Sequence, residues 1–146
     1  MGCGRTGAAL ATDLSADGHD VLVLDTDKSA FRFLPEDFRG SKVVGNGLDV
    51  DTLRKVKLAE ADAFVSTTRG DNRNVMAAQM AKHVFGVRIA GCRVFDPMRE
   101  EMYRNLGLRT INPTRVQAKR LKRMIEAPTE EAASELVQEF LRQEGV

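Results

Sequence analysis

The chain has 146 residues, of which 42% are hydrophobic and 29% are charged, and its formal net charge is +1. This length suits one domain with a sizeable core and is too short for two domains of ordinary size. The near balance of charge gives no electrostatic reason to expect nucleic acid or an anionic membrane as the main partner. No apolar run approaches the roughly 20 residues of a membrane-spanning helix, and no signal-peptide pattern opens the chain. We therefore expect a cytoplasmic protein.

Aliphatic runs and amphipathic segments alternate along the chain. In chain order, we predict a helix over 5–16, strands over 21–24 and 42–44, a helix over 51–60, a strand over 63–66, a helix over 74–85, a strand over 87–94, a helix over 98–106 and a strand over 109–111. Asn112 can cap a further helix whose first residue is Pro113, and Thr129 can cap the last one. Strands that alternate with helices of this length indicate crossover units on a parallel sheet. The predicted fold is α/β, a Rossmann-type doubly wound parallel sheet with helices on both faces, plus C-terminal helices.

The opening Met1-Gly2-Cys3-Gly4-Arg5-Thr6-Gly7 has the pattern G-x-G-x-x-G and leads directly into a helix. Gly2 permits a tight turn, Gly4 lets backbone amides approach a pyrophosphate, and Gly7 allows close packing of helix on strand. The positive end of the helix can then receive phosphates.

The next aliphatic run ends at Asp25, 18 residues after Gly7. This is close to the usual spacing of about 20 residues for an acidic residue that accepts hydrogen bonds from ribose hydroxyls. The charge of Asp25 would repel a 2′-phosphate, so we expect NAD(H) or an adenine nucleotide, ATP or ADP with AMP also possible, and NADP is disfavoured.

A dinucleotide fingerprint normally follows a strand, and Met1 stands where the last residue of that strand belongs. We expect about five more apolar residues upstream in the working polypeptide, or a strand supplied by another chain.

Further motifs follow in a fixed order. They are Gly4-Arg5-x-Gly7, Asp25, Gly45-Asn46-Gly47-Leu48-Asp49, Thr68-x-x-Asp71-x-x-Asn74 and Arg93-x-x-Asp96-Pro97. With this series the chain resembles the TrkA-N domain over roughly residues 1–126. TrkA-N is the nucleotide-binding half of the RCK (KTN) regulators of potassium channels and transporters. The resemblance implies a cytoplasmic domain, peripheral to the inner face of the membrane, which forms homodimers or larger homo-oligomers. It would bind NAD(H) or ATP/ADP and change the activity of a membrane potassium channel or transporter subunit.

Carried over residue by residue, the resemblance implies a set of nucleotide-binding positions. Arg5 matches a loop arginine that can reach a terminal phosphate or the nucleotide of a neighbouring subunit, and Asn46 lies where family members contact adenine, although an aspartate is common there. The expected binding residues are Gly2, Cys3, Gly4, Arg5, Thr6, Gly7, Asp25, Thr26, Asn46, Gly47, Thr67, Thr68, Asp71, Asn74 and Arg93. Residues 1–126 form the predicted nucleotide-binding domain, and 127–146 a C-terminal helix for docking or dimerisation. Because 127–146 is too short for the second ligand domain of many family members, we expect a single-domain member or a fragment.

We predict neither a catalytic nor a metal-binding residue. The histidines, His19 and His83, lie at a turn and near a helix end, and Cys3 and Cys92 lack a paired metal-binding spacing. Cys3 lies at a helix N-terminus, which can lower a thiol pKa and make it a redox sensor. Two alternatives to a sensor stay open: a small NAD-dependent oxidoreductase, and a dimeric scaffold with a vestigial nucleotide pocket.

Overall fold

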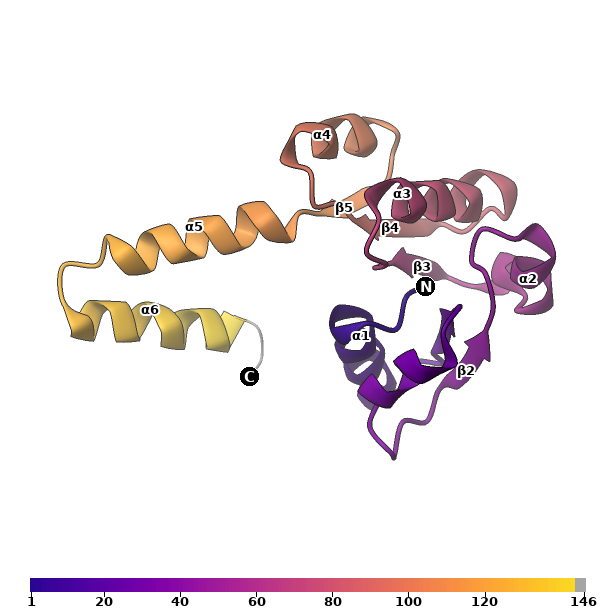
Figure 1. The fold of residues 1–146 in the computed structure, drawn as a ribbon, viewed down its shortest axis with the longest axis horizontal. Helices are drawn as coiled ribbons and strands as arrows, with labels where there is room; N and C mark the ends of the chain where they lie inside the picture. The colour runs from indigo at the N-terminus through magenta and orange to yellow at the C-terminus, as the bar shows by residue number, and fades with distance from the viewer. Residues whose placement is uncertain (144–146) are drawn as a thin grey trace.

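The computed structural model describes residues 1–143 (Figure 1). The first part contains α1 (Arg5–Ala16), β1 (Leu22–Asp25), η1 (Lys28–Phe33), β2 (Ser41–Val44), α2 (Val50–Lys55), η2 (Leu58–Glu60) and β3 (Ala63–Ser66). The second part contains α3 (Asp71–Gln79), η3 (Met80–Val84), β4 (Ile89–Arg93), α4 (Pro97–Asn105), β5 (Arg109–Ile111), α5 (Pro113–Ile125) and α6 (Glu130–Gln143). Strands and helices alternate, as predicted for an α/β fold.

The strands pair in parallel in two groups, β1–β2 and β3–β4–β5. The backbone of Met1 and Gly2 connects the groups. The Gly2 N–H donates to the carbonyl of Leu24 in β1 over 2.8 Å. The Met1 amino group donates to the carbonyl of Val65 in β3 over 2.7 Å, and the Thr67 N–H donates to the Met1 carbonyl over 2.9 Å. These bonds lie where the sequence predicts a central strand, and a strand supplied from upstream or by another chain stays a prediction.

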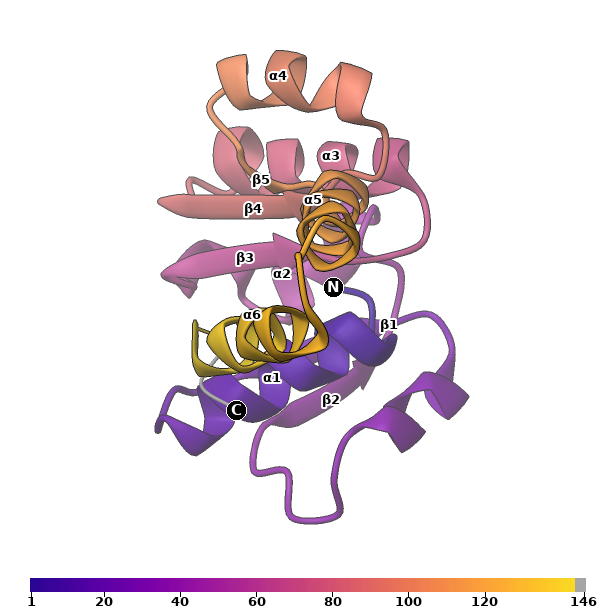
Figure 2. The same cartoon turned by 90° about the vertical axis from the view of Figure 1, so that its left-hand side faces the viewer.

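Helices cover both faces of this layer. Figure 2 shows α3 and α4 on one side of β3, β4 and β5, and α1 on the other side. One core joins α1 to β1 and η1 through Ala8, Ala11 and Val23. A second core packs α2 and α3 against β1 and β3, and a third packs α3 and α4 against β4. The predicted Rossmann-type arrangement, with helices on both faces, is therefore confirmed.

Three local features differ from the prediction. The helix expected over 51–60 is broken after α2, because Lys57 takes a left-handed conformation with φ of 55° before η2 begins. The helix expected over 74–85 begins earlier, at Asp71, and ends in the π-helical turn η3. The 3-10 helix η1, which the sequence did not predict, begins after Asp27. The Asp27 carboxylate caps this helix by accepting a hydrogen bond from the Ser29 N–H over 2.8 Å.

The C-terminal helices form an antiparallel pair that extends to one side of the strands (Figure 1). Both predicted caps are present: Asn112 Oδ1 accepts from the Arg115 N–H over 2.8 Å, and Thr129 Oγ1 accepts from the Ala132 N–H over 3.1 Å. Contacts between the two helices include the Arg123 guanidinium, which lies 5.2 Å from the centre of the Phe140 ring and 3.2 Å from the Glu139 carboxylate. Whether 127–146 acts as a unit apart from 1–126 stays a prediction.

The left-handed turn at Lys57 provides a test of the fold. A non-glycine residue in this conformation costs about 1 kcal/mol, and the Lys57–Glu60 ion pair is exposed and worth little. We expect Lys57→Gly to raise the free energy of unfolding by about 0.5–1 kcal/mol in urea denaturation. The control Lys55→Gly, at the helical end of α2, should give no gain. A loss of stability in Lys57→Gly would contradict the observed backbone conformation.

Candidate functional site

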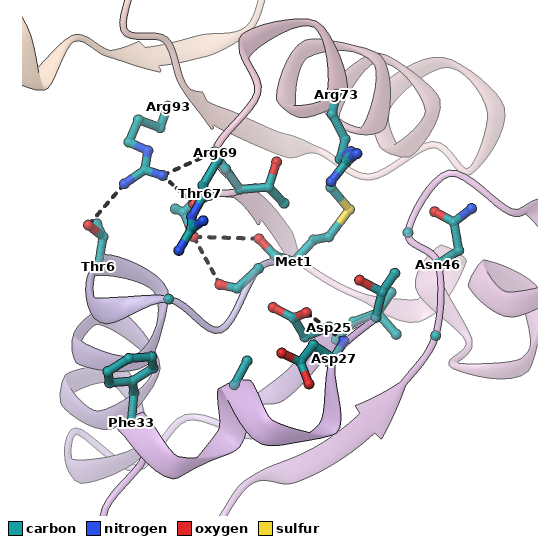
Figure 3. A pocket seen from close by; sticks show the side chains of 18 of the residues that line it. Met1, Thr6, Asp25, Asp27, Phe33, Asn46, Thr67, Arg69, Arg73 and Arg93 are labelled. Atoms are coloured by element: carbon teal, nitrogen blue, oxygen red, sulfur yellow. Dashed lines mark hydrogen bonds between the residues drawn. The ribbon is translucent and has the colours of Figure 1, made fainter.

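A cavity of about 810 Å³ opens at the carboxyl ends of β1, β2 and β3 (Figure 3). This is the edge of an open parallel sheet at which ligands bind in proteins of this architecture, and the volume is within the range of small-molecule pockets. The predicted binding residues that line it are Gly2, Gly4, Arg5, Thr6, Asp25, Thr26, Asn46, Gly47, Thr67, Thr68 and Arg93. The structure therefore brings most of the predicted set together around one space.

The glycine loop forms one wall of the cavity, and its three glycines have different environments. Gly2 has a φ of +91°, and a Cβ there would come within 2.9 Å of the Thr68 nitrogen. A Cβ on Gly7 would overlap the carbonyl oxygen of Gly2. Gly4, in contrast, has no atom within 4 Å of where its Cβ would lie. The space beside Gly4 is thus open on the cavity side, next to the first amides of α1, which have no acceptor within the helix.

Asp25 is oriented by two backbone N–H groups. Its Oδ2 accepts from the Cys3 N–H over 2.7 Å, and its Oδ1 accepts from the Asp27 N–H over 2.9 Å. Each carboxylate oxygen has a further lone pair for a ligand hydroxyl. A fixed carboxylate beside a helix N-terminus is the donor and acceptor arrangement that a ribose next to a phosphate requires, so the residues present fit an adenine nucleotide.

Asp27 also lines the cavity, although the sequence did not single it out. Its carboxylate accepts from the hydroxyl and the N–H of Ser29, and these hydrogen bonds lower the pKa of Asp27. The Asp-x-Ser cap of η1 was the available sequence signal. Asp27 adds a second negative charge at the ribose end of the cavity and so strengthens the case against a 2′-phosphate.

The β3–α3 connection is held by two side chains that do not line the cavity. Asn74 is fully buried, and its Oδ1 accepts from the Ser66 hydroxyl and the Thr68 N–H, both over 2.8 Å. The Asn74 Nδ2 donates to the carbonyls of Thr68 and Arg93, both over 2.9 Å. The oxygens of Asp71 accept from two N–H groups of the β4–α4 connection, again both over 2.9 Å. Asp71 and Asn74, expected as binding residues, thus stabilise the loops that carry the cavity wall.

Arg93 bridges the two sides of the cavity. Its guanidinium donates to the carbonyl oxygens of Thr67 (2.7 Å) and Thr68 (2.9 Å), and to the hydroxyl of Thr6 in the first turn of α1 (3.1 Å). It lies 4.5 Å from the centre of the Phe95 ring. Burial lowers the pKa of Arg93, and the charge of Asp71 opposes this effect. The group keeps its positive charge because its ordinary pKa is far above neutrality.

Cys3 and Gly7 lie behind the loop and do not line the cavity. The Cys3 side chain is fully buried, and burial, with a smaller effect of Asp25, raises the pKa of its thiol. Burial also raises the pKa of Cys92 to about 11, with a smaller contribution from Asp71. The expected depression of the Cys3 pKa at the helix N-terminus is therefore outweighed by desolvation, which does not favour a redox-sensing thiol.

Three arginines of the cavity wall were missed by the sequence analysis. Arg32 lies on η1, with its guanidinium 4.7 Å from the centre of the Phe33 ring, and Arg5 approaches the same ring at 5.6 Å. Arg69 and Arg73 flank Asp71 on the β3–α3 connection. Their place beside the Thr68-x-x-Asp71-x-x-Asn74 motif was a signal that could have included them.

Membrane-spanning helices and clusters of metal ligands are both absent from residues 1–143. None of the helices there has the length and apolar character of a bilayer crossing. No group of three or more histidine, cysteine and carboxylate side chains in the same residues is placed to hold a metal ion.

The chain matches a known protein family. The TrkA-N domain family matches residues 1–113, which is most of the chain. The chain belongs to the TrkA-N domain family. The resemblance inferred from the motifs is therefore confirmed.

Relatives of known name agree with this assignment. The Trk system potassium uptake protein TrkA of Streptomyces coelicolor is 44% identical over 125 residues, which cover 86% of this chain and 56% of that protein. The TrkA homologue of Methanothermobacter thermautotrophicus is 31% identical over 129 residues, covering 88% and 59%. Both relatives are named as TrkA proteins of a Trk potassium uptake system. The chain spans a little over half the length of these relatives.

Solved structures show the same fold. The TrkA-N domain of the inner membrane protein ybaL from Escherichia coli superposes with a TM-score of 0.74 at 17% identity, covering 86% of this chain and 93% of that domain. GsuK bound to ADP superposes with a TM-score of 0.66 at 19% identity, covering 94% of this chain and 38% of that one.

The different surroundings of Gly4 and Gly7 predict different effects of one added methyl group. We expect Gly7→Ala to destabilise the TrkA-N domain by more than about 2 kcal/mol, because its Cβ meets backbone that cannot move aside. Gly4→Ala should cost no more than about 1 kcal/mol at an N-cap position and should weaken nucleotide binding by filling the approach to α1. Thermal unfolding and calorimetric titration with ADP measure the two effects. If Gly4→Ala binds ADP with the affinity of wild type, the phosphate does not bind beside Gly4.

Proposed function

We propose that this TrkA-N domain is the nucleotide-sensing part of a cytoplasmic regulator that gates a membrane potassium channel or transporter subunit. The observation that carries the proposal is the fixed carboxylate of Asp25 beside the open N-terminus of α1. This arrangement supplies an acceptor for ribose hydroxyls and donors for phosphate in one cavity. The homology to TrkA supports a role in potassium uptake, at the inner face of the membrane through the transporter partner.

The proposed ligand is an adenine nucleotide: NAD(H), ATP or ADP, with AMP also possible. NADP is disfavoured because Asp25 and Asp27 place two carboxylates at the ribose end of the cavity. Gly47 and Asn46 line the cavity just beyond the carboxyl end of β2. Asn46 Oδ1 is engaged by the Leu48 N–H over 3.0 Å, so its amide nitrogen is the group that faces a ligand acceptor.

The proposed gating mechanism is a population shift between two arrangements of the domain. The cavity lies between one part built on α1, β1 and β2 and another built on β3, β4 and β5, and Arg93 joins these parts through Thr6. A nucleotide held by Asp25 and by the β3 side contacts both parts at once. Only a difference in affinity between the two arrangements can do work on a transporter.

We also propose that the chain forms a homodimer or a larger homo-oligomer through its C-terminal helices. Leu121 and Ile125 lie one helical turn apart on α5 and are 57% and 83% exposed. Two large aliphatic side chains on one exposed face of a helix are typical of a protein interface. A second copy of α5 has the complementary apolar face by symmetry.

Calorimetric titration with NAD, NADH, ATP, ADP, AMP and NADP tests the nucleotide proposal. We expect binding of at least one adenine nucleotide and weaker binding of NADP. Asp25→Ala should lose on the order of 10-fold or more in affinity, because charged acceptors contribute about 1.5–3 kcal/mol per hydrogen bond. Asp20→Ala, an exposed carboxylate in the turn before β1, is the control. If the folded wild-type chain binds none of these nucleotides, the cavity is vestigial and the protein is a scaffold.

The oligomer proposal predicts a specific effect of charge on α5. We expect Ile125→Glu to lower the molar mass measured by light scattering toward that of a monomer, because a carboxylate is costly to bury in an interface. Lys119→Gln, which makes the same change of charge on another face of the same helix, is the matched control. The same mass for wild type and Ile125→Glu would exclude this face as the interface.

A further inference from the structure

The cavity has an acidic side and a basic side. Figure 3 shows Asp25 and Asp27 on one side, and Arg69, Arg73 and Arg93 extending from the β3–α3 side. Arg5 and Arg32, which meet at Phe33, also line the cavity near the carboxylates, so the first side is mixed in charge and suits neutral hydroxyls. The charged groups on the second side are all arginines, so that side suits negative charge.

The arginines of the cavity differ in whether they already have protein partners. Arg93 donates to two carbonyl oxygens and to the Thr6 hydroxyl. Arg5 and Arg32 approach the Phe33 ring, and Arg32 also donates to Ser29. Within residues 1–143, Arg69 and Arg73 make no hydrogen bond or ion pair with a protein group. These two guanidinium groups are therefore the cavity cations that no hydrogen bond, ion pair or ring contact within residues 1–143 engages, while Arg5 has only its contact with Phe33 and can also meet a phosphate.

The backbone that carries Arg69 and Arg73 is fixed, although their side chains are exposed. Asn74 ties the end of β3 to the start of α3. The carboxylate between the two arginines, that of Asp71, is engaged by the N–H groups of Phe95 and Asp96 and forms no ion pair with either arginine. The loop therefore presents two cations from a rigid support at the cavity wall, which lowers the entropic cost of binding an anion.

From these observations we infer that Arg69 and Arg73 bind the terminal phosphates of a nucleoside di- or triphosphate. The inference rests on the proposed nucleotide function and names its ligand class as an adenosine polyphosphate. With the ribose on Asp25 and the first phosphate at α1, a further phosphate extends toward β3 and meets these guanidinium groups, which suit phosphate by charge and by their paired donors. NADH puts an uncharged nicotinamide on that side and NAD a cationic one, so neither uses the two arginines. AMP does not reach them.

Calorimetric titrations of Arg69→Gln, Arg73→Gln and the double variant with ATP, ADP, AMP and NADH test this ligand class. EDTA in the buffer removes divalent metal ions, so that each nucleotide carries its full negative charge. In wild type we expect affinity to fall in the order ATP, ADP, AMP. Each substitution should weaken ATP on the order of 10-fold and leave AMP and NADH within about 2-fold. ATP binding should also weaken more steeply with salt than AMP binding, because more charges interact.

The matched control is Arg88→Gln, which removes one positive charge immediately before β4, at the opposite end of the strands from the cavity. It should leave every affinity unchanged, and the thermal unfolding of all variants should match wild type because Arg69 and Arg73 hold no protein group. Equal losses for ATP and AMP in the arginine variants, or no loss of ATP binding, would overturn the inference and leave the nucleotide function standing. If wild type binds no adenine nucleotide, the proposed function itself fails. A wild-type preference for NADH over ATP would likewise exclude the polyphosphate class.

Discussion

The cavity depends on how closely α1 approaches the backbone of the first residues. A side chain at position 7 would overlap the carbonyl oxygen of Gly2, and a side chain at position 2 would meet the backbone nitrogen of Thr68. This approach lets the Thr67 hydroxyl donate to the Gly2 carbonyl over 3.1 Å. It also directs the N-terminus of α1 at the space beside Asp25. Two glycines are therefore a steric requirement for placing a helix dipole and a carboxylate on one cavity.

The charge distribution of the cavity depends on which polar side chains already have hydrogen-bond partners within the protein. Buried polar side chains need hydrogen-bond partners. Here the buried Asn74 amide and the Asp71 carboxylate accept hydrogen bonds from the backbone of neighbouring loops. Asp25 accepts from the backbone but keeps acceptor capacity on the cavity side. Asp71 and Asn74, which do not line the cavity themselves, thus hold the loops that carry its basic side.

Two of the TrkA-N motifs are connected to each other by hydrogen bonds in this chain. The Thr68-x-x-Asp71-x-x-Asn74 motif and the arginine of Arg93-x-x-Asp96-Pro97 are joined to each other, since Asn74 donates to the Arg93 carbonyl and the Arg93 side chain donates to the Thr68 carbonyl. Through Thr6, the same arginine reaches α1. Arg93 and Asn74 therefore connect the two sides of the cavity by hydrogen bonds.

The sequence by itself determined the features that depend on short-range pattern. The period of apolar residues and the caps at Asn112 and Thr129 predicted the alternating fold and the starts of α5 and α6, and the spacing from Gly7 to Asp25 predicted the glycine loop with its acidic partner. Only the tertiary structure decided which of the motif residues face the cavity. Asp71 and Asn74 turned out to support loops, and Arg69 and Arg73 to line the wall. The orientations of Asn74 and Asp71 are set by hydrogen bonds to β4 and to the β4–α4 connection, about 20 residues or more away in the chain. The left-handed turn at Lys57 and the short helix η1 were likewise invisible to a periodicity argument, because each occupies too few residues to show a repeat.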